Sequence, residues 1–87
     1  MPAKVVMYSK TTCPYCHHAE RVLRERGVKD LEMIQIDIDR ERRAEMIERA
    51  NRSTVPQIFI DDRHVGGCDD LVALDRAGGL MPLLQQQ

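Results

Sequence analysis

Two cysteines separated by two residues carry the clearest chemistry in this chain. Cys13 and Cys16 bracket Pro14 and Tyr15, and this spacing lets the two sulfurs close a disulfide. We expect Cys13 at the start of a helix, where unpaired backbone N–H groups and the helix dipole favour a thiolate. Lys10 adds positive charge shortly before it. The pattern predicts a dithiol redox site, with Cys13 as the nucleophile and Cys16 as the resolving cysteine.

Two other chemistries share this spacing. With His17 the string reads Cys-x-x-Cys-His, which matches c-type haem attachment. That chemistry normally requires export, and the first residues lack the apolar stretch of a signal peptide. A zinc site would combine Cys13 and Cys16 with a histidine and Cys68, but a second Cys-x-x-Cys or a spaced histidine pair is missing. We therefore expect no metal. His17 and His18 are interpreted as exposed helix residues, with proton transfer as the alternative.

A second motif is Thr54-Val55-Pro56, which precedes a β-prone run. A proline that opens a strand can be structural only, since it removes one ladder donor. Beside a Cys-x-x-Cys and a βαβ pattern, it predicts a cis peptide bond that turns the preceding backbone toward the redox site. Val55 would then offer its N–H and C=O to an extended, peptide-like ligand.

The third motif is residues 66–70, Gly-Gly-Cys-Asp-Asp. Tandem glycines permit close backbone approach or a positive φ, and Asp69 at a helix start leaves N–H groups for a carboxylate ligand. The alternative is a plain turn in which Asp69 is only the N-cap. Cys68 is interpreted as a buried, inert thiol, with an auxiliary redox thiol as the alternative.

Short apolar and alternating runs predict the strands that position these motifs. They cover residues 5–8, 31–39, 56–60 and 63–65. In the second run Ile34, Ile36 and Ile38 share one face. Asp61 and Asp62 form the turn between the last two strands, which predicts a hairpin.

Helical spacing predicts three helices between and after these strands. Pro14 suits the first turn of one helix, which Gly27 ends; Asp39 caps the next, residues 40–51; and Asp69 caps the last. Their predicted faces comprise Ala19, Val22, Leu23 and Arg26 in the first, Ala44, Ile47 and Ala50 beside Met46 in the second, and Leu71, Val72, Leu74 and Ala77 before Gly78-Gly79 in the third. The many charges of the second helix are interpreted as a solvated face.

The order β-α-β-α-β-β-α predicts an α/β fold with a central four-stranded mixed sheet, because a βαβ opening gives a parallel pair and a hairpin adds antiparallel strands. The 87 residues suit one domain, 1–87, with residues 85–87 as a frayed tail. A formal net charge of −1 argues against nucleic acid or an anionic membrane as partner. No apolar run is long enough to cross a membrane, and we expect a cytoplasmic protein.

Together the three motifs resemble the glutaredoxin family, in particular its small bacterial dithiol class, the glutaredoxin 3 type. The resemblance rests on residues 10–16 (Lys-Thr-Thr-Cys-Pro-Tyr-Cys), 54–60 (Thr-Val-Pro-Gln-Ile-Phe-Ile) and 66–70. It extends from about Val5 to Leu84. Thioredoxins differ, since their motif looks like Cys-Gly-Pro-Cys with flanking tryptophan, and this chain has no tryptophan.

The resemblance implies a thioredoxin-like fold and a glutathione-dependent disulfide oxidoreductase that reduces protein disulfides and glutathione mixed disulfides. Glutathione would be the co-substrate, with its cysteinyl backbone paired to Val55 and its γ-glutamyl end at the turn before the last helix. The residues expected to bind it are Lys10, Tyr15, Thr54, Val55, Pro56, Gly67, Cys68, Asp69 and Asp70.

The resemblance also implies a role in electron transport and cell redox homeostasis as a monomer. Its partners would be glutathione and disulfide-containing or glutathionylated proteins, with ribonucleotide reductase as one candidate. The alternative is iron–sulfur cluster binding or delivery by a glutathione-ligated dimer. The Pro14-Tyr15 spacer and the second thiol, Cys16, look more like the dithiol enzymes than the monothiol cluster carriers.

Overall fold

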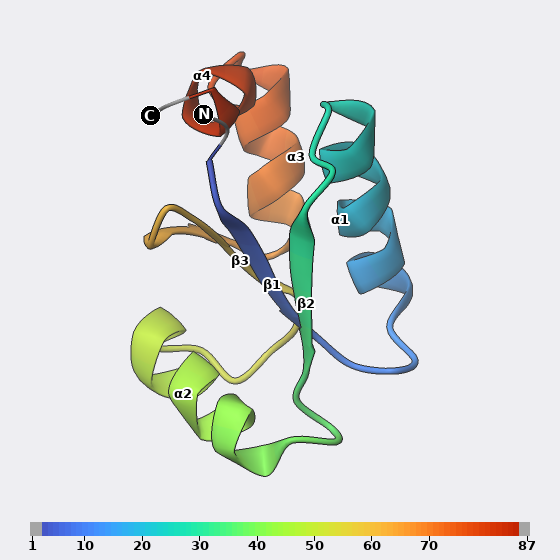
Figure 1. Cartoon of the computed structure of the whole chain (residues 1–87), viewed down its shortest axis with the longest axis vertical. Coiled ribbons are helices and arrows are strands. Elements are labelled where there is room, and N and C mark those ends of the chain that lie inside the picture. The colour runs from blue at the N-terminus through green and yellow to red at the C-terminus, as the bar shows by residue number, and fades with distance from the viewer. Residues whose placement is uncertain (1–2, 86–87) are drawn as a thin grey trace.

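The computed structural model describes residues 3–85 and contains a four-stranded mixed sheet (Figure 1). The strands are β1 (Val5–Ser9), β2 (Leu31–Gln35), β3 (Gln57–Ile60) and β4 (Arg63–Gly66), arranged in the order β2-β1-β3-β4. β1 runs parallel to β2 and antiparallel to β3, and β3 pairs antiparallel with β4. The predicted α/β class and mixed sheet are confirmed.

The central strand β1 is buried along its whole length, because helices cover both faces of the sheet. Since side chains alternate along a strand, Val5 and Met7 enter one apolar cluster while Val6 and Tyr8 enter another. The near-continuous apolar character of this strand therefore reflects burial on two sides.

Three helices pack on the Val5 and Met7 side of the sheet: α1 (Pro14–Glu25), α3 (Cys68–Arg76) and α4 (Leu80–Leu84). α1 and α3 lie beside each other, and α2 (Arg40–Ala50) lies apart from them against the other face (Figure 1). α4 is an addition to the predicted order. It extends the core after Gly78, whose φ of +80° ends α3, and its Leu80 is fully buried.

The second predicted strand is shorter than the alternation suggested. β2 ends at Gln35, and the N–H groups of Ile38 and Asp39 both bond back to its carbonyl. The chain therefore turns before the third isoleucine: Ile36 stays in the core, whereas Ile38 is 70% exposed. The prediction that alternate isoleucines face the core is confirmed for Ile34 and Ile36 and is wrong for Ile38. Hydrophobic alternation alone does not locate the turn that ends the strand.

Helix ends follow the predicted capping residues in two places. Asp39 accepts a bond from the Arg42 N–H at 3.3 Å at the start of α2, and Gly27 takes a φ of +95° just after α1, a conformation that favours glycine. Arg26, the last residue of the predicted face, is not part of the core. It is exposed at the end of α1, where its Nε donates to Asp75 of α3 at 2.7 Å.

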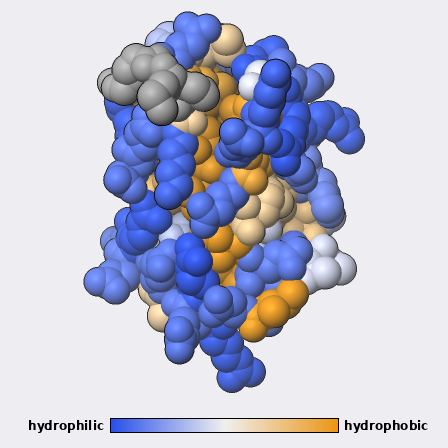
Figure 2. All heavy atoms as spheres, viewed as in Figure 1, coloured by the Kyte–Doolittle hydropathy of each residue, from blue (hydrophilic) through white to orange (hydrophobic). Residues whose placement is uncertain are grey.

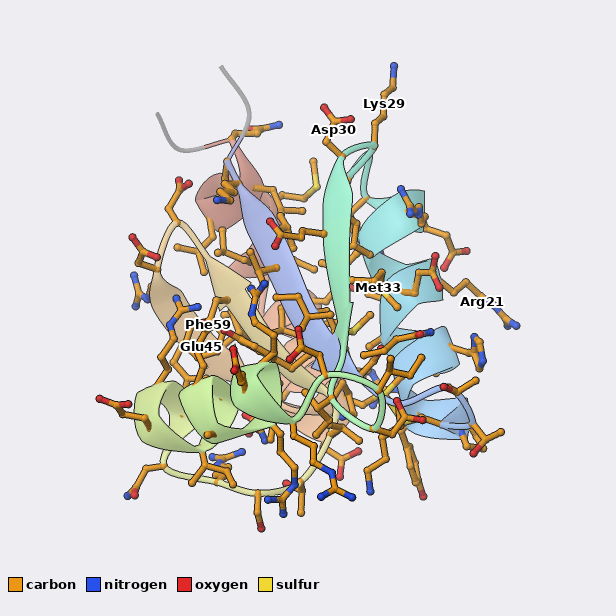
Figure 3. The ribbon with its side chains drawn as sticks, turned by 60° about the horizontal axis from the view of Figure 1, so that its bottom comes forward. Arg21, Lys29, Asp30, Met33, Glu45 and Phe59 are labelled. Atoms are coloured by element: carbon orange, nitrogen blue, oxygen red, sulfur yellow. A yellow bond between two sulfur atoms is a disulfide. The ribbon has the colours of Figure 1, made fainter. Side chains whose placement is uncertain are left out.

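The buried face of α2 also differs from the prediction. Met46 and Ala50 are buried, with Ile47 partly buried, while Ala44 is exposed. The helix is therefore rotated relative to the predicted stripe. Figure 3 shows Glu45 rising from α2 toward Phe59 on β3.

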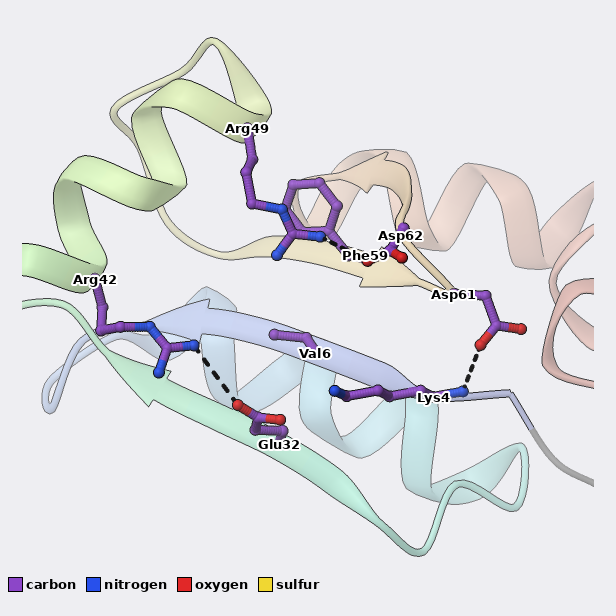
Figure 4. Close-up of a pocket in the computed structure, with 8 residues that line it drawn as sticks. All are labelled: Lys4, Val6, Glu32, Arg42, Arg49, Phe59, Asp61 and Asp62. Atoms are coloured by element: carbon purple, nitrogen blue, oxygen red, sulfur yellow. Dashed lines mark hydrogen bonds and ion pairs between the residues drawn. The ribbon is translucent and has the colours of Figure 1, made fainter.

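This rotation turns part of the supposedly solvated charged face toward the sheet. The buried Tyr8 hydroxyl donates to Glu45 and accepts from Arg49, whose guanidinium also lies 4.1 Å from the centre of the Phe59 ring. Arg49 and Asp62 form an ion pair at 3.2 Å across a pocket of about 250 Å³ (Figure 4). These charges hold α2 on the sheet, so the interpretation as purely solvated is wrong for them.

Much of the surface is polar, and Figure 2 shows a narrow apolar band between charged side chains on one face. Within residues 3–85, no helix combines the length and the apolar character needed to cross a bilayer. Of the tail expected at 85–87, Gln85 follows α4 and its N–H bonds to Met81 at 3.0 Å; Gln86 and Gln87 lie outside the described residues.

Candidate active site

Cys13 and Cys16 form a disulfide at the N-terminus of α1, with their Cα atoms 5.2 Å apart. Cys13 is the N-cap, Pro14 occupies the first turn, and the Cys16 N–H points to the Cys13 sulfur at 3.1 Å. Cys13 is 8% exposed and Cys16 is 2% exposed. Cys13 is thus the more exposed of the two, as predicted. Its sulfur also accepts the Cys16 N–H at the helix start, and this bond stabilises negative charge.

The loop before Cys13 is held by a residue that the sequence motifs did not identify. Thr11 donates to Asp37 Oδ2 from its N–H at 3.2 Å and from its hydroxyl at 2.7 Å. The Thr11 hydroxyl bond lowers the pKa of Asp37 against a smaller opposing effect of burial, and the charge of Lys10 contributes last. Asp37 lies in the turn after β2, so no spacing within residues 10–16 could have revealed it.

The Val55–Pro56 bond is cis, as predicted. Pro56 is buried, Val55 is partly buried and Thr54 is exposed. This segment is fixed by Gln57, whose side-chain Nε2 donates to the Thr54 carbonyl at 3.1 Å and approaches its hydroxyl at 3.3 Å. Gln57 is 1% exposed. A polar amide within a β-prone apolar run was the one feature of the sequence that could have indicated this structural role.

Gln57 also connects this segment to β4. Its Oε1 lies 2.7 Å from His64 Nε2, and the His64 ring stacks on Phe59 at a centroid distance of 4.9 Å. Burial lowers the pKa of His64, and the nearby charge of Arg52 acts in the same direction. A neutral imidazole at this position suits the hydrogen bond to an uncharged amide.

The turn at residues 66–70 differs from the prediction in its capping residue. α3 begins at Cys68 and its N-cap is Gly67, so Asp69 is already inside the helix. Asp70 completes the turn instead: its Oδ2 accepts the Gly67 N–H at 2.8 Å and pairs with Arg52 at 3.0 Å. The Gly67 bond and then Arg52 lower the pKa of Asp70.

This turn lies against the cis proline. A Cβ added to Gly67 would stand 3.4 Å from the Pro56 carbonyl oxygen, so the turn and the cis-proline segment are in contact at this position. Cys68 is buried and its thiol is free. Burial first, and the neighbouring Asp69 second, raise the pKa of Cys68, which favours the protonated thiol.

A groove of about 680 Å³ opens between α1 and α3 beside the disulfide. Its lining residues are Pro14, Tyr15, His18, Cys68, Asp69, Val72, Ala73 and Arg76. The groove therefore brings together Tyr15, Cys68 and Asp69 from the predicted glutathione residues. The others stand outside its lining: Lys10, Thr54, Val55, Pro56, Gly67 and Asp70.

Of the two adjacent histidines, only His18 lines this groove. Both are exposed, as predicted, but the sequence did not distinguish their directions. Among residues 3–85, no group of three or more histidine, cysteine or acidic side chains is placed to hold a metal ion.

Comparison with known proteins agrees with this arrangement. The glutaredoxin family model matches residues 5–65. The chain is 57% identical over 83 residues to glutaredoxin 3 of Escherichia coli K12, covering 95% of this chain and 99% of that protein.

Solved structures give the same result. The solution structure of glutaredoxin from Brucella melitensis matches with a TM-score of 0.83 and 45% identity, covering 97% of this chain and 90% of that one. The crystal structure of a buckwheat glutaredoxin–glutathione complex matches with a TM-score of 0.85 and 30% identity, covering 94% and 76%. With the fold, the cysteine pair and the relatives in agreement, the chain belongs to the glutaredoxin family.

Proposed function

We propose that this chain reduces protein disulfides and glutathione mixed disulfides through Cys13 and Cys16, with glutathione as the electron donor. Glutaredoxins are glutathione-dependent thiol–disulfide oxidoreductases, and this chain is a close relative of glutaredoxin 3. The observation that carries the proposal is the Cys13–Cys16 pair, which closes a disulfide at the N-terminus of α1.

Cys13 is the nucleophile in this proposal. Its sulfur accepts a backbone N–H at the helix start, and Cys13 is the more exposed residue of the pair. Lys10 and the N-terminal end of the helix dipole favour its thiolate. The Thr11–Asp37 bonds hold the preceding loop in place, so the sulfur is presented in one position.

We assign glutathione to the surface that joins the cis proline, the turn at residues 66–70 and the near end of the groove. Val55 would pair with the cysteinyl backbone, with Thr54 and Pro56 on either side. Lys10 and Tyr15 would flank the sulfur. The buckwheat relative was solved as a complex with glutathione, which supports a site for this tripeptide on the shared fold.

The γ-glutamyl end would lie at the start of α3. Asp69 is exposed and can receive the ammonium, while the Cys68 N–H and the helix dipole favour the carboxylate. Asp70 contributes by holding the turn, since its carboxylate already binds the Gly67 N–H and Arg52.

With a glutathionylated protein, the Cys13 thiolate attacks the glutathione sulfur. The protein thiolate leaves and takes a proton, and glutathione remains on Cys13. The thiolate of a second glutathione then attacks this mixed disulfide, which gives glutathione disulfide and restores Cys13. Cys16 takes no part in this route.

With a protein disulfide, Cys13 attacks one sulfur and the other leaves as a thiolate. Cys16 loses its proton and attacks the Cys13 sulfur, which releases the second substrate thiol and closes the Cys13–Cys16 disulfide. Two glutathione molecules then reduce that disulfide in successive exchanges and become glutathione disulfide.

The proposal extends to the setting of the enzyme. We propose that the 87 residues form one domain, as their number suits, and that the protein acts as a monomer. The free Cys68 thiol suits a reducing compartment such as the cytoplasm. Ribonucleotide reductase stays a candidate partner, as a protein whose disulfide needs periodic reduction.

Cys13→Ser tests the proposal. We expect wild type to consume glutathione with the mixed disulfide of glutathione and 2-mercaptoethanol, and Cys13→Ser to lose this activity. Arg43→Gln on α2, an exposed residue outside the set assigned to glutathione, is the control and should stay active. An active Cys13→Ser variant, or an inactive wild type, would contradict the proposal.

A further inference from the structure

The groove between α1 and α3 extends beyond the residues assigned to glutathione. Tyr15, Cys68 and Asp69 line its near end, next to the disulfide. His18 on α1 and Arg76 on α3 also line it, and the proposed function gives them no role.

Helical spacing sets the length and the pattern of this surface. Asp69, Val72, Ala73 and Arg76 follow one another at i, i+3, i+4 and i+7, so they share one face of α3. At about 1.5 Å per residue, Arg76 lies about 10 Å along the axis from Asp69. The groove therefore has an acid at its near end, small apolar side chains in the middle and a base at its far end.

The base at the far end is available for a ligand. Within residues 3–85, no ion pair joins Arg76 to a carboxylate. The neighbouring carboxylate in the sequence, Asp75, is already held by Arg26 at 2.7 and 2.9 Å. His18 contributes an imidazole from the opposite wall. Asp69 is the single acidic side chain among the lining residues.

We propose that the far part of this groove binds the polypeptide of a protein disulfide, with an acidic side chain of that polypeptide against Arg76 and His18. This inference rests on the proposed function and names its substrate class. In the mixed disulfide with Cys13, the bound segment runs from the sulfur past Val72 and Ala73, whose small side chains leave room for a backbone.

The length of the groove along α3 sets the expected position of the acidic residue. The span of about 10 Å from Asp69 to Arg76 corresponds to about three residues of an extended chain, which advances about 3.3 Å per residue. We take the substrate cysteine, bound to Cys13, to lie at the Asp69 end of this span. The preferred substrates carry Asp or Glu about three residues from the reactive cysteine. A substrate with Lys at that position brings its positive charge against Arg76, and this repulsion lowers its affinity for the groove.

The test compares two peptides that differ only in this charge. Each has one cysteine and forms a symmetrical disulfide dimer, with either Glu or Lys at the third residue on both sides of the cysteine. Wild type should show a kcat/KM about fivefold higher for the Glu peptide, since an exposed ion pair contributes up to about that factor. The uncatalysed reaction of glutathione with each peptide is subtracted.

Charge reversal at the groove should reverse the preference. We expect Arg76→Glu to favour the Lys peptide and Arg76→Gln to show little preference. The matched control is Arg43→Glu on α2, which makes the same change in net charge on the other face of the sheet. It should keep the preference of wild type.

The two proposals fail in different ways. All variants should retain wild-type activity on the glutathione–2-mercaptoethanol disulfide, which has no polypeptide. If wild type itself lacks that activity, the proposed function is wrong. If that activity is present but wild type does not prefer the Glu peptide, or Arg76→Gln and Arg76→Glu keep its preference, the groove does not bind substrate in this way.

Discussion

At the scale of single residues, the three cysteines have different surroundings. Cys13 and Cys16 share a disulfide at a helix N-terminus, whereas Cys68 is a free thiol buried at the start of α3. Burial and Asp69 raise the pKa of Cys68, so the thiolate needed for alkylation is disfavoured there.

This difference predicts the order of alkylation in the reduced protein. With limiting iodoacetamide at pH 7, Cys13 should be modified first and Cys68 last, as followed by peptide mass spectrometry. Denatured protein is the control, because all three thiols should then react at similar rates. Modification of Cys68 as fast as that of Cys13 in the folded protein would show an exposed, reactive thiol.

At the scale of elements, a buried amide joins the cis-proline segment to β4. Gln57 donates to Thr54 through Nε2, and its Oε1 accepts a hydrogen bond from His64 Nε2. Gln57→Met keeps a similar volume but leaves both partners without this bond. We expect a loss of about 1–3 kcal/mol in the free energy of unfolding, measured by urea denaturation, and a raised KM for glutathione because the Val55 backbone is less firmly held.

Gln35→Met is the matched control for this change. Gln35 is the exposed last residue of β2, so its replacement should alter stability by less than about 0.5 kcal/mol. If Gln57→Met and wild type have the same midpoint of urea denaturation, the hydrogen bonds of Gln57 do not fix the cis-proline segment.

The turn before α3 should make stability depend on pH. The folded pKa of Asp70 is lowered by the Gly67 N–H and by Arg52, so its stabilising effect is present above the unfolded pKa and is lost as pH falls through the folded pKa. Asp70→Asn should be less stable than wild type at pH 7, by about 1 kcal/mol, as for a lost helix cap. Thermal melts should show this difference shrinking from about pH 5 to about pH 2.

Asp69→Asn serves as the comparison, since Asp69 is exposed and makes no capping bond in this turn. It should follow the wild-type pH dependence. If the stability difference between Asp70→Asn and wild type is the same at pH 2 as at pH 7, the effect comes from the altered side-chain packing and not from the carboxylate charge.

At the scale of the whole molecule, much of the fold was predictable because burial leaves a clear pattern. Both faces of β1 are covered, so Val5 to Tyr8 appears as a continuous apolar run. The cysteine pair at a strand-to-helix junction and the proline before a strand likewise depend on local geometry, and both predictions were confirmed in position.

The errors arose at local turns that hydrophobic spacing does not locate and where tertiary contacts decide between local options. Ile38 has the right spacing for a strand, but the chain turns after Gln35. Asp69 and Asp70 are equally good capping residues by type, and Arg52, from a distant segment, pairs with Asp70. Asp37 contacts Thr11 across 26 positions of sequence. No local pattern contains these contacts.

The alternative of a cluster carrier makes a prediction about the whole molecule. After anaerobic reconstitution with iron, sulfide and glutathione, we expect a colourless monomer by absorbance and size-exclusion chromatography. Cys16→Ser treated in the same way shows whether the second thiol decides this outcome. A coloured wild-type dimer would favour the cluster-binding function.

A paired assay separates the role of Cys13 as nucleophile from the role of Cys16 as resolving cysteine. Wild type and Cys16→Ser are compared for glutathione-dependent reduction of the glutathione–2-mercaptoethanol disulfide and of a protein disulfide. We expect Cys16→Ser to retain the first activity and to lose the second. Loss of both activities in a folded Cys16→Ser, or retention of both, would contradict these roles.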